Sequence, residues 1–199
     1  MALAQESGFA VTDDEIHPLL HPFQREAVKW AVRGGRRALF EAFGLGKSMQ
    51  QLEVCRLILA KTGGGKGLIV CPLGVRQEFT RDAAKLGTPL RFIRTTAEAD
   101  AEGLYLTNYE SVREGKLDPR GFTVVSLDEA AILRGFGGTK TFRTLMGLFE
   151  GTSTYRFVAT ATPDPNEYIE LAAYADFLGI MQTGEIKTLI REAIDAGFY

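Results

Sequence analysis

The sequence has few of the residues that usually form disulfide or metal frameworks. It contains only two cysteines and two histidines in 199 residues. Cys55 and Cys71 lie inside periodic apolar segments, which argues against a disulfide framework and fits a reducing cytoplasm. Neither His17 nor His21 has a cysteine or aspartate partner at metal-ligand spacing, so we expect both to be loop histidines.

Long apolar runs and a charge surplus are also missing. No run approaches the roughly 18 residues that a membrane-spanning helix needs, and the acidic start MALAQESGFAVTDDE has no apolar signal core. We therefore expect a cytoplasmic protein without a membrane partner. A net charge of −2 argues against a surface that coats nucleic acid broadly, but it leaves room for a local basic strip.

What the chain does contain is an alternation of short apolar runs and helical stretches. Such alternation predicts parallel strands with right-handed crossovers, and hence a doubly wound, mainly parallel α/β sheet that binds ligands at the carboxyl ends of its strands. We divide the chain into a lead-in (1–19), one α/β domain (20–184) and a last segment (185–199) that is either a C-terminal helix or the start of a connection to a second domain. The predicted strands are Ala38–Glu41, Gly67–Cys71, Leu90–Ile93, Gly103–Thr107, Thr123–Leu127 and Arg156–Thr160. The predicted helices are Pro22–Val32, Lys47–Lys61, Val75–Leu86, Lys140–Phe149, Asn166–Leu178 and Glu185–Ala196.

The segment LFEAFGLGKSMQ predicts a phosphate-binding loop between a strand and a helix. Gly44, Leu45 and Gly46 would bring backbone N–H groups close to phosphate oxygens, and the helix N-terminus adds a favourable dipole. Lys47 would reach the β and γ phosphates, and Ser48 would offer a hydroxyl to Mg²⁺. The first glycine of the common GxxxxGK[ST] pattern is Glu41 here. The alternative is a glycine turn before a helix with a chance lysine, but strand, loop and helix occur in the required order.

An acidic pair follows the apolar run FTVVSL. In phosphoryl-transfer sites one carboxylate holds Mg²⁺ and another orients the attacking water, so we assign Asp128 to the metal and Glu129 to the water. After the next strand, the hydroxyls of Thr160 and Thr162 are placed to bond the acidic pair and relay nucleotide state. A hydroxyl-rich turn before a proline is the alternative for these two threonines.

Taken in order, these motifs resemble the first motor domain of superfamily-two helicases and translocases. The similarity is strongest to Swi/Snf-type motors and to DEAD-like helicases of phages and prophages, and it spans roughly Leu20 to Met181. It implies a RecA-like P-loop fold, ATP and Mg²⁺ as ligands, and Gln24 as a reader of the adenine edge. The matching segments are LHPFQREAVKWAV, FGLGKS, LIVCPLGV, LTNYESV, LDEAAILRGFGGTKT and FVATATPDPNEYIEL.

The resemblance also implies a nucleic-acid partner, most simply a DNA backbone contacted by loops after the strands. Hydroxyls and helix N-termini suit such phosphate contacts, although an ordinary surface loop is an equally good interpretation of each. The candidates are Pro72, Gly74, Arg76, Thr107, Asn108 and Tyr109.

Two departures from the family pattern bear on function. Ala131 occupies the position of the DEAH histidine, which puts the coupling of hydrolysis to movement in question. The family also uses a second motor domain, for which the chain has no room after Met181. We therefore expect the ATP-binding half of a motor, with weak hydrolysis when isolated and its second half missing or supplied by another chain.

Two other classes of protein stay open. One is a different P-loop protein, a nucleotide switch or kinase, which a preference for guanine would favour. The other is a degenerate domain that serves only to bind proteins. Intact Lys47, Ser48, Asp128 and Glu129 argue against degeneracy.

Overall fold

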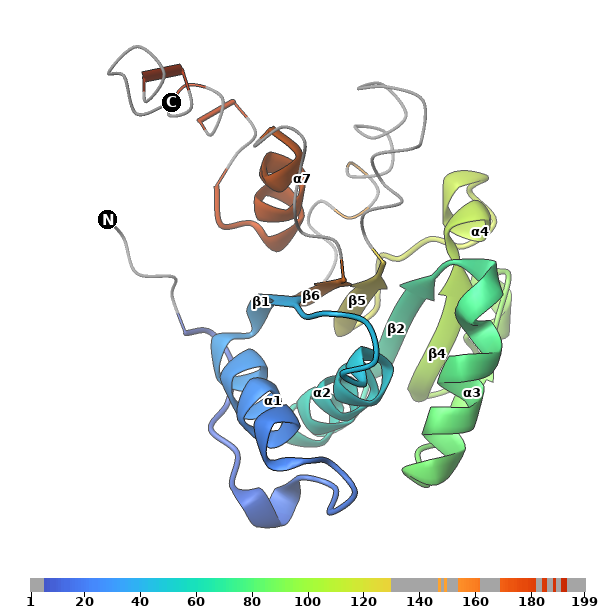
Figure 1. The fold of residues 1–199 in the computed structure, drawn as a ribbon. Coiled ribbons are helices and arrows are strands. Elements are labelled where there is room, and N and C mark those ends of the chain that lie inside the picture. Colours follow the sequence, from blue (N-terminus) through green and yellow to red (C-terminus); the bar gives the residue numbers. More distant parts are fainter. Residues whose placement is uncertain are drawn as a thin grey trace.

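Six parallel strands form one sheet in the computed structural model of the chain (Figure 1). The structure describes residues 6–129, 154–161 and 169–181, with residues 147, 149, 184, 185, 188, 191 and 192. Within them the strand order is β1-β6-β5-β2-β4-β3, and every neighbouring pair is parallel. This confirms the predicted doubly wound sheet and all six predicted strands. The bounds are β1 Arg36–Phe40, β2 Lys66–Cys71, β3 Leu90–Phe92, β4 Gly103–Asn108, β5 Val124–Asp128 and β6 Tyr155–Thr160.

The helices follow the predicted pattern with one addition. Helix α2 has the predicted bounds, whereas α1, α3 and α7 differ from the prediction only at their ends. Helix α4 is new, because its five residues are too few to show a helical period. The predicted helices 140–149 and 185–196 lie mostly outside the described residues. The bounds are α1 Pro22–Gly34, α2 Lys47–Lys61, α3 Arg76–Lys85, α4 Tyr109–Arg113 and α7 Ile169–Leu178, with 3₁₀ turns η1 Asp13–Glu15, η2 Leu73–Val75 and η3 Thr96–Glu98.

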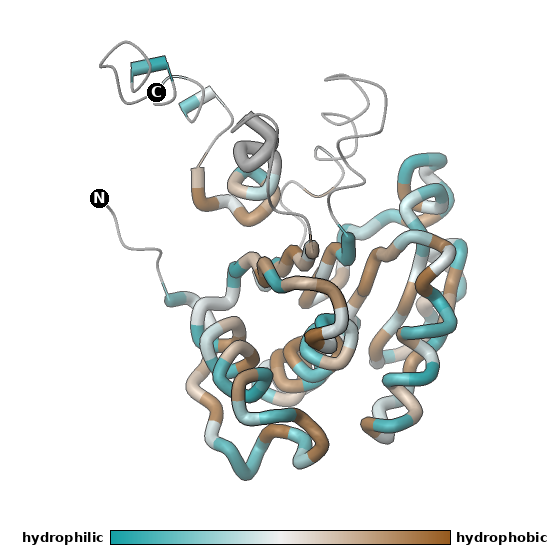
Figure 2. The backbone as a smooth tube through the Cα atoms, in the orientation of Figure 1, coloured by the Kyte–Doolittle hydropathy of each residue, from teal (hydrophilic) through white to brown (hydrophobic). Residues whose placement is uncertain are grey.

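Apolar side chains pack on both faces of the sheet. Along β2, Ile69 and Cys71 join a core that includes α1, α2 and α3, whereas Leu68 and Val70 join a second core with α4 and α7. Figure 2 shows the strands as mostly hydrophobic between more polar helices. Burial on both faces explains why the strands are apolar throughout rather than alternating. Among the described residues, no helix is both long and apolar enough to cross a membrane.

The parallel arrangement places all strand ends along one edge of the sheet. The loop after β1, the turn η2, the start of α4 and the acidic end of β5 therefore share this edge. Helix α1 begins at the same edge, as shown by a hydrogen bond from Gln24 to Leu45 in the loop after β1. The fold thus gathers every predicted site segment that the structure describes.

Candidate nucleotide and magnesium site

The loop between β1 and α2 has the backbone form that anion binding needs. Gly44 and Gly46 have φ angles of 82° and 75°, in the left-handed region that glycine adopts at little cost. Within the described part of the chain, no hydrogen bond is recorded from the backbone N–H groups of residues 43–46. These donors and the first turn of α2 are the groups that phosphate oxygens use at a helix N-terminus.

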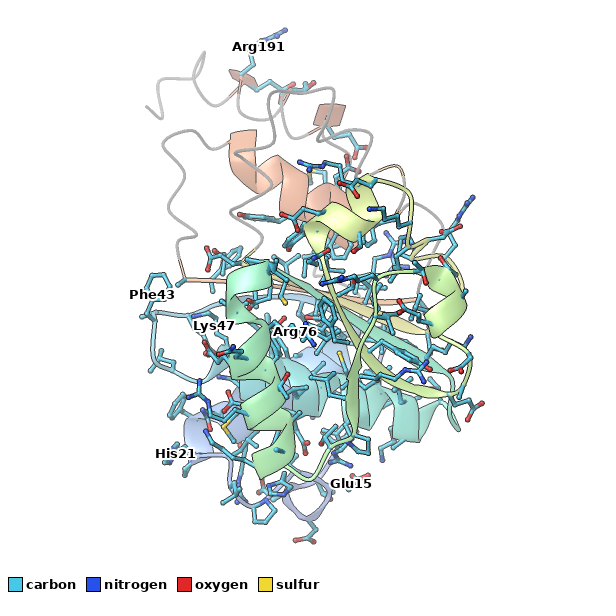
Figure 3. All side chains as sticks on the ribbon, turned by 90° about the vertical axis from the view of Figure 1, so that its right-hand side faces the viewer. Glu15, His21, Phe43, Lys47, Arg76 and Arg191 are labelled. Atoms are coloured by element: carbon cyan, nitrogen blue, oxygen red, sulfur yellow. The ribbon has the colours of Figure 1, made fainter. Side chains whose placement is uncertain are left out.

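Lys47, the first residue of α2, folds back over this loop. Its Nζ donates to the carbonyl oxygens of Glu41 at 3.0 Å and Ala42 at 3.1 Å. The same ammonium lies 5.4 Å from the ring centre of Phe43, which projects from the loop (Figure 3). The positive charge is therefore held beside the free N–H groups, where an anion would be bound.

Glu41 explains why the loop departs from the common glycine pattern. Its φ angle is not positive, and its N–H donates to Thr160 O at 3.2 Å, which continues the pairing of β1 with β6. Its carboxylate Oε2 accepts a hydrogen bond from Gln50 Nε2 at 2.7 Å. A position whose φ angle is not positive needs no glycine, so the departure does not disturb the loop.

Gln24 connects the start of α1 to the loop. Its Oε1 accepts from the N–H of His21 at 2.8 Å, and its Nε2 donates to Leu45 O at 2.8 Å. The side chain is buried, and a Cβ on Gly46 would overlap its Nε2. Gln24 thus shapes the loop directly, whereas its predicted contact with adenine stays a prediction.

Ser48 bonds to helix α3. Its Oγ donates to Asp82 Oδ2 at 2.6 Å and lies 3.3 Å from Glu78 Oε1. A hydroxyl has one hydrogen and two lone pairs, so the Ser48 oxygen can still coordinate a cation while Asp82 accepts its hydrogen. Asp82 was not among the predicted site residues. Its signal in the sequence is helical spacing: it lies three residues after Phe79 and directly before Ala83, and both are buried on the same helix face.

Asp128 ends β5 as a buried carboxylate, 9% exposed. Burial raises its pKa from 3.8 to about 6; a hydrogen bond from Gln51 and the charge of Lys47 oppose the rise, and the charge of Glu129 adds to it. Gln51 Nε2 donates to Asp128 Oδ1 at 2.7 Å. A nearby cation would favour the ionised form of such a group.

Glu129 has a φ angle of 45°, the one positive φ of a non-glycine residue in the described chain. Backbone in this region is strained for most side chains and often occurs at functional sites. Thr160 Oγ1 donates to Glu129 Oε1 at 3.2 Å. The predicted bond between Thr160, which ends β6, and the acidic pair is therefore present, while Thr162 lies outside the described residues.

The oxygen donors at this edge are suited to Mg²⁺. The Ser48 hydroxyl and the Asp128 carboxylate are hard oxygen ligands, which Mg²⁺ prefers. Among the described residues, no group of three or more His, Cys, Asp or Glu side chains could hold a metal ion by itself. Mg²⁺ is commonly bound by one or two protein oxygens together with water and substrate phosphates, so the sparse donor set fits a metal that arrives with a nucleotide.

The nucleic-acid candidates divide into two groups. Thr107, Asn108 and Tyr109 are buried; Asn108 caps α4 by accepting from Ser111 N at 2.9 Å, and Tyr109 OH donates to Asp128 O at 2.8 Å. The structure therefore does not present these three side chains to a nucleic acid. The other candidates belong to the 72–76 segment, where Gly74 and Arg76 are exposed and Pro72 is half-buried.

Solved structures of SWI2/SNF2 ATPase cores and of a helicase share this fold. The Sulfolobus solfataricus SWI2/SNF2 ATPase core in complex with dsDNA superposes with a TM-score of 0.74 and 23% identity over 90% of this chain and 41% of its own. This chain has the fold of a RecA-like helicase motor domain. The S. solfataricus SWI2/SNF2 ATPase core domain gives 0.73 and 21% identity over 98% of this chain and 44% of its own. The UvsW helicase of bacteriophage T4 gives 0.62 and 16% identity over 90% of this chain and 62% of its own.

Sequence comparison gives a weaker likeness. No protein-family model matches the chain. Human TATA-binding protein-associated factor 172 is 25% identical over 193 residues, which cover 82% of this chain and 10% of that protein. This chain therefore spans only part of the length of the proteins that it resembles.

Proposed function

We propose that this chain is the ATP-binding half of an ATP-dependent DNA helicase or translocase. The observation that carries this proposal is the meeting of three segments at one sheet edge: the glycine loop with Lys47, the acidic pair after β5, and Gln24 from α1. In this proposal Lys47 binds the β and γ phosphates, while Ser48 and Asp128 hold Mg²⁺. The metal would neutralise charge on the phosphoryl oxygens.

Hydrolysis would depend on the acidic pair. Glu129 would orient the attacking water, and its hydrogen bond from Thr160 would report the state of the nucleotide to the end of β6. Motors of this kind need an arginine finger from a partner to stabilise the transition state. This chain covers 41% and 44% of the two SWI2/SNF2 ATPase cores with this fold, which supports a second motor domain as that partner.

For DNA, we propose backbone contacts by the 72–76 segment, in which Gly74 and Arg76 are exposed. Arg76 begins α3, and its guanidinium lies 3.9 Å from the ring centre of Phe92. Exposed cationic and backbone donors at a helix start suit phosphates without reading sequence. One of the solved structures with this fold is an ATPase core in complex with dsDNA, which supports duplex DNA as the partner.

Nucleotide affinity tests the proposal. Lys47→Ala removes a charged hydrogen bond to phosphate of about 1.5–3 kcal/mol, so the affinity for a fluorescent ATP analogue with Mg²⁺ should fall at least about tenfold. Lys61→Ala is the matched control, because Lys61 ends the same helix α2 and forms an ion pair with Glu15. Unchanged affinity in Lys47→Ala, or a preference for guanine nucleotides, would contradict the assignment. Rapid DNA-stimulated hydrolysis by the isolated chain would contradict the need for a second domain.

A further inference from the structure

Three buried polar side chains are joined by hydrogen bonds at the acidic end of β5. Ser126 Oγ donates to Gln51 Oε1 at 2.7 Å, and Gln51 Nε2 donates to Asp128 Oδ1 at 2.7 Å. Ser126 is 0% and Gln51 1% exposed. These two hydrogen bonds therefore link helix α2, which follows the phosphate loop, to strand β5, which ends at Asp128.

The chemistry of the three groups permits only one orientation of the Gln51 amide. An ionised carboxylate can only accept hydrogen bonds, so the NH₂ group must face Asp128. The amide oxygen then faces Ser126, whose hydroxyl supplies the hydrogen. Because an unbonded buried polar atom costs about 1–3 kcal/mol, the alternative orientation is strongly disfavoured.

This arrangement restrains the Asp128 carboxylate. Among the described residues, Gln51 alone donates a hydrogen bond to that carboxylate, and it bonds Oδ1. Rotation of the carboxylate would break this bond and leave the buried Gln51 amide without its acceptor. The second carboxylate oxygen is thereby left available to another partner.

We propose that Gln51, itself held by Ser126, is the positioning residue that orients Asp128 toward the Mg²⁺ of a bound nucleotide. The inference rests on the proposed function, in which Asp128 holds that metal. Side chains that orient metal ligands typically change metal affinity by about 10–100-fold when removed. A purely structural Gln51 would instead change the stability of the α2–β5 contact and leave metal affinity alone.

Binding of a fluorescent ADP analogue, titrated with and without Mg²⁺ at about pH 8, separates these roles. In Gln51→Leu, we expect affinity in EDTA to match that of the unmodified protein, because the phosphate loop is intact. The Mg²⁺ concentration needed for half-maximal enhancement should rise about 10–100-fold. Thr88→Val is the control: Thr88 is buried, its hydroxyl makes no hydrogen bond among the described residues, and it precedes β3 at the opposite edge.

A double variant separates the loss of the Gln51 contact to Asp128 from any destabilisation of the fold that Gln51→Leu causes. Gln51→Leu leaves the Ser126 hydroxyl without its partner, whereas Gln51→Leu/Ser126→Ala removes that stranded donor as well. The same rise in the half-maximal Mg²⁺ concentration in the double variant would support the inference. The inference is overturned, and the proposed function stands, if Mg²⁺ enhances nucleotide binding by the original protein and both variants need the same Mg²⁺ concentration for half-maximal enhancement. If unmodified protein binds no nucleotide, both are overturned.

Discussion

At the scale of single residues, the charge on Asp128 should make stability depend on pH. Burial raises the pKa of this carboxylate to about 6 in the folded chain, against 3.8 in its ordinary state. The folded protein therefore binds the proton more tightly than the unfolded chain between these two values. The contribution of Asp128 to the free energy of unfolding is therefore fully present below about pH 3.8 and is lost as the pH rises through about 6.

Asp128→Asn should accordingly stabilise the metal-free protein at neutral pH. Asparagine keeps an oxygen that can accept from Gln51 but removes the buried charge. The difference between the two pKa values, 3.8 and about 6, limits the gain in unfolding free energy to at most about 3 kcal/mol, at about 1.4 kcal/mol per pKa unit. Urea unfolding in EDTA at a series of pH values measures this gain, which should shrink as the pH falls from about 6 to about 4.

Asp118→Asn is the control for this series. Asp118 is paired with Arg120, whose hydrogen bond lowers the pKa of that carboxyl, so its replacement should give no gain at neutral pH. A gain in Asp128→Asn that stays constant across the pH range would show that burial does not raise the pKa of Asp128.

At the scale of elements, the loop between β1 and α2 offers a matched pair of glycines. Gly44 and Gly46 both have left-handed φ angles, so alanine costs roughly 1–2 kcal/mol of backbone strain at either position. They differ in their surroundings. An added Cβ at Gly44 meets open space, whereas one at Gly46 overlaps the buried amide of Gln24.

Gly46→Ala should therefore destabilise the protein more than Gly44→Ala. Displacing Gln24 breaks its bonds to His21 and Leu45, at about 0.5–1.5 kcal/mol for each. The difference in unfolding free energy between the two variants isolates the contribution of Gln24. Equal destabilisation would mean that Gln24 moves aside without loss and does not shape the loop.

At the scale of the whole molecule, β6 holds the sheet together although it comes late in the chain. It pairs with β1 on one side and with β5 on the other. It is the partner of β1 in the described sheet, which has no other strand beside β1. Helix α7 then packs on β6 and β1. The phosphate loop and the acidic pair, which follow β1 and β5, are thus aligned through β6.

A chain that ends at residue 153 should therefore fail to fold cooperatively. It would leave β1 without its pairing partner and expose the apolar edge of β5, which favours aggregation. A chain that ends at residue 181 keeps all six strands and α7 and serves as the comparison. Circular dichroism with urea unfolding distinguishes them, and a cooperative transition in the shorter chain would refute the central role of β6.

The sequence by itself predicted the fold and the main site segments. Continuous apolar strands between helical stretches determined a parallel sheet, because strands buried on both faces leave that pattern. The glycines and Lys47 marked the start of α2, and Asp128 marked the end of β5. Each of these patterns lies within a short stretch of sequence, so it can be identified without knowing which elements pack together.

Tertiary packing alone decided the partners of these residues. Asp82 bonds Ser48 and Gln51 bonds Asp128 because α3 packs on α2 and α2 packs on β5, and no local pattern specifies that pairing. The same packing buries Thr107 and Tyr109, whose positions after a strand had suggested a nucleic-acid contact. The sequence thus determined where the chemistry lies along the chain, while burial and neighbouring elements decided which side chains can reach a ligand.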